Sequence, residues 1–597
     1  MNVSEYIFDF FEKKGINTVF MITGGQAMWL DDAVGRNKSY NIIFNHHEQA
    51  CTMSADAYGR MMNKPAITLV TAGPAAVNAM NGVVGGYIDS APMIIISGQS
   101  QLFFVKYEES TGIRQHGIQG INIKPLVEKI TKYFVTIDDP KKLNIYLEEA
   151  YNSAITARMG PVWLDVPLDV QNMQIDAAAM LPYKPKITKP PKHGIEQAVK
   201  KTYELLKKSK RPVILAGQGI KLAGATEQFR KFIEYNQIPV ITARLGIDLI
   251  ESDNRLYVGR PGNYGDRAAN FAIQNADLII SAGCKMASSL VSYDPKNFGK
   301  NSVKIAIDID RKELDKPGAH LDYKARIDCR DYFNALNEIA VSEKLPGYKE
   351  WVETCNNWKM KYPVVLKEYR NEDPVNSYYF IDRLCEAVSP ESAVLVDAGS
   401  CFHVTCQAWK VKKGQNFLTS GGLSSMGYWV ASIGVCMAND RKETICITGD
   451  GSLQMNIQEF ATIRQNNLPI KVFIFNNNGY GIIKLTQRNF MEGRFMGVNP
   501  ATGVWFPDSL EIAKAYGIKG IRISHVNEVE NGIKEALAHN GPVICDVITP
   551  EYQLLIPRIA SDKMPDGTLV ARAYDDMFPF LPREEYDNNI IAKKNKK

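Results

Sequence analysis

The sequence lacks the features that mark secreted, membrane-embedded and nucleic-acid-binding proteins. Its ten cysteines form no Cys-x-x-Cys pair, so reduced thiols are expected rather than a metal or redox motif. The chain opens as an amphipathic helix without a signal peptide. Its most apolar stretch, residues 65–98, is broken by proline, asparagine and aspartate, which excludes a membrane span.

Charge of one sign is also scarce. The net charge is +5, and a run of lysines near the end of the chain supplies four of those charges: Lys593, Lys594, Lys596 and Lys597. The rest of the chain is close to neutral and has no basic stripe, so neither nucleic acid nor membrane is expected as a partner. These absences together predict a cytoplasmic protein.

The 597 residues are enough for about three domains. Short apolar runs alternate with helical patterns throughout, which predicts an α/β protein with three successive doubly wound parallel sheets. A Pro- and Lys-rich run at 182–192 separates the first two domains. A helical stretch is predicted over 331–370, and the polar break at 371–374 that ends it separates the last two. The three domains are predicted over 1–185, 192–345 and 372–550. An irregular C-terminal arm with a basic tail is predicted over 551–597.

One strand–helix–strand stretch in the last third carries the strongest chemical signal. Buried strands are predicted over 444–448 and 471–475; Asp450 follows the first and Asn477 the second. Both side chains are therefore expected at the carboxyl ends of neighbouring strands, where open α/β sheets bind ligands. Carboxylate and amide oxygens are hard donors that suit Mg²⁺.

Gly451 and Ser452 open the helix that follows Asp450, so their N–H groups are expected to face an anion. Metal and anion together predict a diphosphate. An ordinary strand–turn–helix with an Asp cap would give the same Gly-Asp-Gly letters. The Asn476–Asn477 pair further along favours the ligand site, and the whole pattern resembles the signature of thiamine-diphosphate (ThDP) enzymes.

Motifs elsewhere extend this resemblance over roughly residues 3–550, to the acetolactate synthase-like branch. The first third carries His47-Glu48-Gln49 and Thr71-Ala72-Gly73-Pro74 with Asn78; the last third carries Gly421-Gly422-Leu423-Ser424-Ser425-Met426-Gly427. The resemblance implies a pyrimidine-binding domain, a central domain and a diphosphate-binding domain, in that order.

The resemblance gives Glu48 the central catalytic role. In the family a glutamate hydrogen-bonds the cofactor's aminopyrimidine ring and promotes loss of the thiazolium C2 proton. A plain helix cap is the alternative interpretation of Glu48. Gln119 is the second catalytic candidate, although the family has an acid at the following position, where this chain has Gly120. Gly25 and Asn78 are expected to contact the cofactor.

The remaining candidates lie in the third domain. The resemblance implies Mg²⁺ ligands at Asp450, Asn477 and the backbone of Gly479. Met426 matches the apolar residue that supports the bent cofactor, although a core methionine would look the same. Gly399-Ser400-Cys401 lies where the family has a diphosphate-binding Gly-Gln-His, so only backbone binding is expected at Gly399 and Ser400. Further cofactor contacts are expected at Gly451, Ser452 and Tyr480.

The central domain departs most from the family. Acetolactate synthases carry FAD there and use a loop arginine for both FAD and the acceptor pyruvate; the aligned loop here, 282–290, has Ser289 in its place. FAD is therefore expected to be weak or absent, and a neutral acceptor is favoured. With the Asp-Met-x-Pro-Phe-Leu segment of the C-terminal arm, the chain looks similar to an offshoot found with surface-polysaccharide genes.

Several functions remain open at this point. The first is a carboligase that decarboxylates a 2-oxo acid such as pyruvate and passes the two-carbon unit to a carbonyl acceptor, possibly a nucleotide-linked keto-sugar. The alternatives are a true acetolactate synthase, a simple decarboxylase and a catalytically silent relative. A homodimer or homotetramer is expected, because in the family Glu48 and Asp450 of one site come from different chains.

Overall fold

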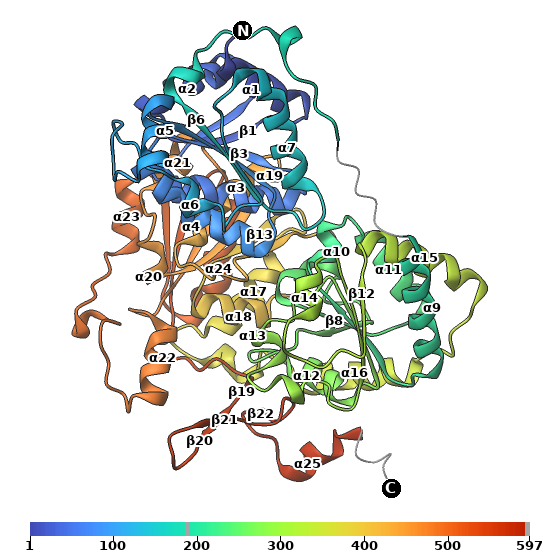
Figure 1. Ribbon diagram of the computed structural model, residues 1–597. Helices are drawn as coiled ribbons and strands as arrows, with labels where there is room; N and C mark the ends of the chain where they lie inside the picture. Colours follow the sequence, from blue (N-terminus) through green and yellow to red (C-terminus); the bar gives the residue numbers. More distant parts are fainter. Residues whose placement is uncertain (186–191, 592–597) are drawn as a thin grey trace.

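The computed structural model describes residues 1–185 and 192–591 and contains three α/β domains in sequence (Figure 1). Most of the predicted first linker and the predicted basic tail lie outside the described residues. Each domain has one six-stranded sheet in which every strand pair is parallel. Among the described helices none is long and apolar enough to cross a membrane. The predicted fold class is confirmed.

The first domain (blue in Figure 1) is built around a sheet of order β2-β1-β3-β4-β6-β5. Its strands are β1 (Thr18–Met21), β2 (Asn41–Phe44), β3 (Ala66–Val70), β4 (Met93–Gln99), β5 (Tyr133–Thr136) and β6 (Pro161–Pro167). Its helices are α1 (Val3–Lys13), α2 (Met28–Arg36), α3 (Glu48–Met62), α4 (Pro74–Asp89), α5 (Leu102–Thr111), α6 (Lys124–Val127), α7 (Leu143–Ile155) and α8 (Leu168–Gln171).

The central domain has a different strand order, β12-β11-β10-β7-β8-β9. Its strands are β7 (Pro212–Ala216), β8 (Val240–Thr242), β9 (Tyr257–Gly259), β10 (Leu278–Ala282), β11 (Val303–Asp308) and β12 (Tyr323–Arg326). Its helices are α9 (Lys192–Lys208), α10 (Gly219–Leu222), α11 (Thr226–Asn236), α12 (Arg267–Asn275), α13 (Ser288–Val291), α14 (Arg311–Asp315), α15 (Cys329–Ser342) and α16 (Lys349–Lys361). The strand order reverses direction between β7 and β10.

The third domain repeats the strand order of the first, as β14-β13-β15-β16-β18-β17. Its strands are β13 (Ala393–Val396), β14 (Phe417–Thr419), β15 (Thr444–Gly449), β16 (Ile470–Asn476), β17 (Lys519–Ile523) and β18 (Val543–Ile548). Its helices are α17 (Ser377–Ala387), α18 (Ser400–Ala408), α19 (Ala431–Ala438), α20 (Asp450–Leu453), α21 (Glu459–Gln465), α22 (Gly481–Phe490), α23 (Ser509–Ala515) and α24 (Val529–Ala538).

Two helical predictions need correction. The run after Asp450 is not one helix: α20 ends at Leu453, and α21 begins at Glu459 beyond Asn456, whose φ of 73° no helix tolerates. The helical stretch expected over 331–370 is likewise split between α15 and α16, with Gly347 at φ 81° between them. In both places a residue with left-handed backbone geometry interrupts the helix.

The C-terminal arm returns to the central domain (red, below the green domain in Figure 1). It consists of the antiparallel pairs β19 (Arg558–Ile559) with β22 (Met577–Phe578) and β20 (Ser561–Lys563) with β21 (Leu569–Ala571), followed by α25 (Arg583–Asn588). Tyr574 and Met577 are buried in the central-domain core. The Tyr574 hydroxyl donates to the Leu290 carbonyl, 2.5 Å away, so the arm braces the loop predicted to face the acceptor.

The first and third domains share one apolar core within the chain. Helix α3 packs on α19 so closely that a Cβ at Gly434 would lie 1.9 Å from the Ser54 carbonyl oxygen. A buried polar group extends this junction, because Arg60 donates to the Thr419 carbonyl at 2.8 Å and lies 3.1 Å from the Asp56 carboxylate. The two outer domains are therefore held rigidly against each other.

Candidate active site

The candidate residues of the first domain meet at the carboxyl ends of its strands. Glu48 heads α3, and the Asn78 amide donates to its Oε2 at 3.0 Å. His47 caps the same helix, its Nδ1 accepting from the Gln49 N–H at 3.1 Å, so this histidine has a structural role. Glu48 is half-buried and Asn78 is exposed. The carboxylate is thus oriented but accessible.

The predicted Gly25 lies in a turn that contacts the strand β3 loop. The Gln26 N–H donates to the Thr71 hydroxyl at 3.2 Å, while a Cβ added at Gly25 would meet no atom within 4 Å. The backbone of this turn is therefore open to a ligand. In this sheet the strand order reverses between β1 and β3, which is where open parallel sheets bind ligands.

Gln119 lies against the turn that contains Gly73. A Cβ on Gly73 would lie 2.3 Å from the Gln119 carbonyl oxygen, so the two turns touch. Packing explains why position 120 is a glycine, because a Cβ there would lie 2.8 Å from the Ser100 hydroxyl and 3.2 Å from a Glu108 oxygen. A side chain as large as the family's acid would displace this loop.

Sequence reasoning missed Glu108, which holds the Gln119 loop in place. Its buried carboxylate accepts from the N–H groups of His116 and Gly117, at 2.7 and 2.9 Å. Its position on α5 gives no hint of this contact, because the pairing depends on how the loop folds back. A buried carboxylate that accepts two backbone N–H groups fixes a loop firmly.

In the third domain the predicted metal ligands lie together at the ends of β15 and β16. Asp450 is buried; its Oδ1 accepts from the Gly451 N–H at 2.7 Å and its Oδ2 from the Gly479 N–H at 2.9 Å. Burial raises the pKa of its carboxyl to about 6. The Asn477 Oδ1 is buried without a hydrogen-bond partner among the described residues. A buried oxygen without a partner is costly unless something binds it.

Gly399, Ser400 and Tyr480 surround this pair. Gly399, at φ 101°, caps α18, and a Cβ on Gly481 would lie 3.0 Å from the Asn477 amide nitrogen and 3.3 Å from the Ser400 hydroxyl. A Cβ on Gly451 would lie 2.4 Å from the Tyr480 ring. The strand order of this sheet reverses between β13 and β15, so the group again occupies the reversal point.

The Ser452 side chain does not test the predicted cofactor contact, which is made by the backbone N–H and stays a prediction. Its hydroxyl donates to Asp397 Oδ2 at 2.5 Å and accepts from the Gly427 N–H at 2.7 Å, so the side chain is occupied within the protein. Asp397, missed as a site residue, also accepts from Thr448 and from the Tyr428 N–H. Burial raises its pKa to about 6. It fixes the turn that follows Met426, which is half-buried.

The two groups of candidates share no direct polar contact within one chain. No hydrogen bond or ion pair of the described residues joins Glu48 or Gln119 to Asp450 or Asn477. Other contacts join the two domains: the Glu459 carboxylate accepts from the Asn45 amide and the His46 N–H, each at 2.9 Å, and the Ser425 hydroxyl donates to the Asn81 Oδ1 at 2.9 Å.

Comparison with known proteins defines the class. Three parts of the chain match the domain families of thiamine pyrophosphate enzymes. Residues 1–126 match the N-terminal TPP binding domain, residues 199–336 the central domain, and residues 397–547 the C-terminal TPP binding domain. The three domains are therefore those of a ThDP-dependent enzyme.

The relatives narrow this class. A probable acetolactate synthase large subunit of Methanocaldococcus jannaschii is 30% identical over 570 residues, 93% of each chain. The acetolactate synthase large subunit of Lactococcus lactis is 29% identical over 98% of each chain. The chloroplastic acetolactate synthase of Arabidopsis thaliana is 30% identical over 92% of this chain and 82% of its own. The chain belongs to the acetolactate synthase-like family of ThDP-dependent enzymes and is a ThDP-dependent carboligase.

The residues present fit the cofactor's diphosphate and its metal. Within the described residues no cluster of three or more His, Cys, Asp or Glu side chains could hold a metal ion. A site for Mg²⁺ bound to diphosphate needs fewer protein ligands, because phosphate oxygens and water complete the coordination. Asp450 and the partnerless Asn477 Oδ1 supply two hard oxygens just beyond the ends of the paired strands β15 and β16.

Proposed function

We propose that the protein decarboxylates a 2-oxo acid, pyruvate in the first instance, and transfers the two-carbon unit to a carbonyl acceptor, with ThDP and Mg²⁺ as cofactors. The observation that carries the proposal is the Asn477 Oδ1, buried and without a partner beside the buried Asp450. Family membership alone would not show that this chain keeps its metal ligands. The buried Asn477 Oδ1 without a partner supports the proposal because a bound cation would satisfy it.

Each residue has a physical role in this proposal. When bound, ThDP would supply the nucleophilic carbon that attacks the 2-oxo acid. The Asn78 amide holds the Glu48 carboxylate at 3.0 Å, so that the carboxylate can share a proton with the pyrimidine ring nitrogen. Asp450 and Asn477 would hold Mg²⁺, and Met426 would support the bent cofactor.

We further propose a homodimer in which the first-domain candidates of one chain and the third-domain candidates of its partner together form one site, so that each group is a half-site. Large apolar side chains flank both halves: on the first domain Phe103 and Ile118 are 67% and 78% exposed, and on the third Met496 and Trp505 are 79% and 75% exposed. Exposed apolar side chains in such numbers mark interaction surfaces. A two-fold axis would pair the first domain of one chain with the third domain of its partner, twice.

Flavin is not part of the proposal. The central cavity would admit a flavin nucleotide by volume, so the expectation of no FAD rests on the loop chemistry, with Ser289 in place of an arginine. The alternative that remains is acetolactate synthase proper, in which pyruvate is also the acceptor.

The test uses titration of ThDP with Mg²⁺ and release of CO₂ from pyruvate. Wild-type protein should bind ThDP only with Mg²⁺ and release CO₂. Asp450→Ala should abolish Mg²⁺-dependent binding and Asn477→Ala should weaken it, since each removes a metal ligand. Asn439→Ala, on the surface of the same domain, serves as control. Wild-type ThDP affinity in Asp450→Ala would refute the metal site, and absence of CO₂ release by the loaded wild type would refute pyruvate as the donor.

A further inference from the structure

A cavity of about 830 Å³ lies where the central domain meets the two outer domains. Its floor is formed by the turns that follow β7 and β10, the two strands between which the order of the central sheet reverses. Parallel sheets bind ligands at this point, and the volume suits a ligand of substrate size. Gly421, Gly422 and Ser424 of the third domain close its other side.

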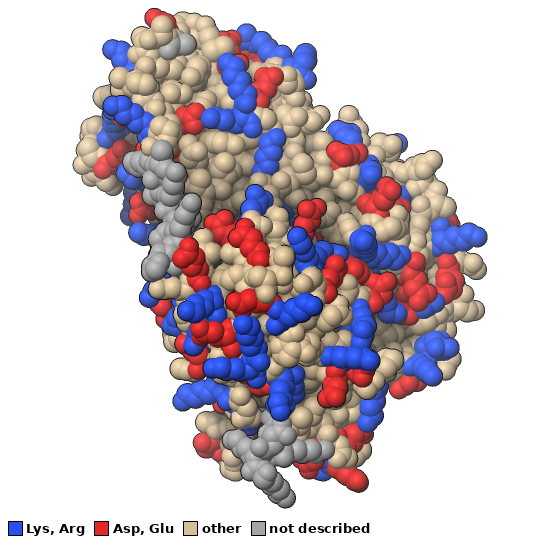
Figure 2. All heavy atoms as spheres, turned by 90° about the vertical axis from the view of Figure 1, so that its right-hand side faces the viewer, with Lys and Arg blue, Asp and Glu red and all other residues tan. Residues whose placement is uncertain are grey.

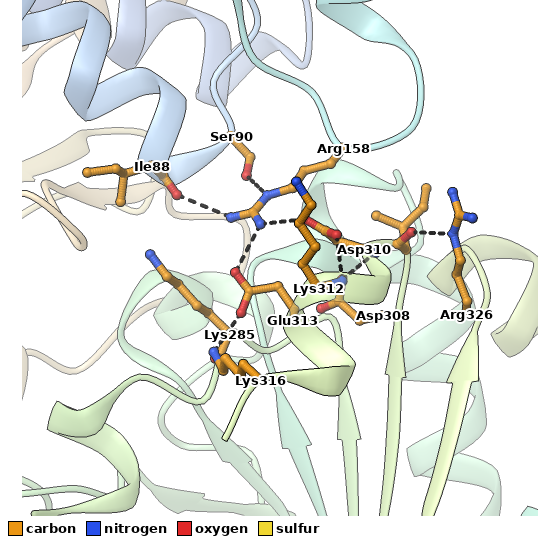
Figure 3. A network of polar contacts seen from close by, with 11 residues as sticks. Ile88, Ser90, Arg158, Lys285, Asp308, Asp310, Lys312, Glu313, Lys316 and Arg326 are labelled. Carbon is orange, nitrogen blue, oxygen red and sulfur yellow. Dashed lines mark hydrogen bonds and ion pairs between the residues drawn. The ribbon is translucent and has the colours of Figure 1, made fainter. Parts of the chain in front are cut away.

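Most cations around this cavity are already occupied or face solvent. Arg158 bridges the first and central domains, with Asp310 and Glu313 each 2.9 Å from its Nη1 and the Ser90 hydroxyl 2.9 Å from its Nε (Figure 3). Arg330 is exposed and donates to the Gly224 carbonyl at 3.3 Å. Lys285 is exposed. On the outer face of this region positive and negative side chains are intermingled (Figure 2).

Arg244 is different. It lines the cavity and is half-buried, and it makes no hydrogen bond or ion pair with any described residue. Its guanidinium lies 4.3 Å from the ring centroid of Phe402, which leaves the N–H edges of the plane for another group. The nearby Asp89 is not free to pair with it, because its two oxygens accept from the Gly421 and Gly422 N–H groups at 2.8 and 2.9 Å.

The position of Arg244 connects the cavity with the proposed cofactor site. The next residue, Leu245, packs under the glycine turn, where a Cβ on Gly421 would lie 2.6 Å from its side chain. That turn leads directly to Met426. Phe402 lies on α18, two residues after the predicted contact Ser400. A molecule in this cavity would therefore hold its charged end at Arg244, beside the segment that carries Met426.

We infer that the acceptor substrate binds in this cavity and that Arg244 recognises an anionic group on it, either a phosphate or a carboxylate. The inference rests on the proposed function. Half-buried arginine with free N–H groups binds such oxyanions strongly and directionally. The 282–290 loop lacks an arginine at Ser289, and Arg244, after strand β8, supplies a cation to the same cavity instead. The expected acceptor therefore changes from an uncharged compound to a keto compound that carries an anionic group.

The first experiment measures binding, independently of turnover. Full-length protein saturated with ThDP and Mg²⁺, so that the diphosphate site is filled, is titrated calorimetrically with uridine diphosphate and with inorganic pyrophosphate. Arg244→Met should weaken binding about 10–100-fold, the usual effect of losing hydrogen bonds to a charged group, and Arg244→Lys should recover part of it. Arg330→Met, at the same cavity, should change binding less than about threefold.

Several outcomes would overturn the inference. They are wild-type protein that binds neither probe, Arg244→Met with wild-type affinity, or Arg330→Met alone losing the binding. Circular dichroism and thermal unfolding of each variant separate a lost contact from a lost fold, and Arg244→Lys covers the case in which the methionine variant does not fold.

The second experiment distinguishes the two sources of the anion. The holoenzyme receives pyruvate with or without a nucleoside-diphosphate-linked keto-sugar, and the products are quantified by mass spectrometry. A higher acceptor KM in Arg244→Lys with the keto-sugar assigns Arg244 to the phosphate, and the same change in acetolactate formation assigns it to the carboxylate. A KM unchanged for both acceptors contradicts the inference. Binding of the probes without any ligation product contradicts the proposed function and leaves the anion site intact.

Discussion

The proposed dimer predicts that two inactive variants restore activity when they are mixed. Glu48→Gln disables the first-domain half and Asp450→Ala the third-domain half; loss of the acid–base group alone should slow the reaction about 10²–10⁴-fold. In a hybrid dimer one site contains both substitutions and the other contains neither. When subunits exchange randomly, half of the dimers are hybrids, and each has one of two sites intact. Activity should therefore return to roughly a quarter of the wild-type value.

The assay is CO₂ release from pyruvate after the two variants are unfolded and refolded together, or exchanged at low concentration. Fluorescence energy transfer between labelled subunits confirms that hybrids form. Glu48→Gln mixed with Asn78→Ala is the matched control, because both changes lie in the same half-site, in which the two side chains are 3.0 Å apart, and no arrangement leaves a site intact. A mixture of Glu48→Gln and Asp450→Ala that stays inactive while energy transfer proves exchange would refute the shared site.

Three further predictions follow from individual residues. In Glu48→Gln, hydrogen–deuterium exchange at C2 of bound ThDP should slow about 10²–10⁴-fold while ThDP affinity stays near wild type; unchanged exchange, read by NMR after acid quench, would contradict the role of Glu48. The pKa of Asp450 is raised by burial to about 6, above its ordinary value of 3.8. Protons should therefore compete with Mg²⁺, and calorimetry should show Mg²⁺ affinity falling as the pH drops through 6, about tenfold per unit. Without metal, the raised pKa of Asp450 stabilises the folded state fully below about pH 4, and this stabilisation is lost as the pH rises through 6. Because Mg²⁺ binds the ionised carboxylate, Mg²⁺ should raise Tm more at pH 7.5 than at pH 5. Finally, Gly120→Asp should displace the Gln119 loop and reduce kcat, whereas Gly112→Ala in the same segment, where a Cβ meets no atom within 4 Å although φ is 70°, should retain the fold of the loop by crystallography or NMR.

The sequence predicted the sheets well because their signals are local. Apolar runs predicted buried strands over 444–448 and 471–475, and the structure has β15 and β16 there with bounds that differ by one residue at most at either end. The candidate metal ligands could be located in the same way, since Asp450 and Asn477 follow these runs. The two broken helices were not predicted, because their interruptions depend on single residues with positive φ, at Asn456 and Gly347, that leave the apolar pattern nearly unchanged.

What the sequence could not supply is the set of residues that act through tertiary contact. Asp397 joins the ends of two strands to the turn at Tyr428, and Glu108 folds a loop onto its own helix. Arg244 has the same origin: it follows an ordinary strand, β8, and only the approach of Phe402 from the third domain and Asp89 from the first leaves it facing a cavity without a partner among the described residues. The motifs pointed to residues that the resemblance assigns to the cofactor. A motif comparison at the 282–290 loop alone finds a missing arginine and does not reveal that Arg244, from another strand end, lines the same cavity.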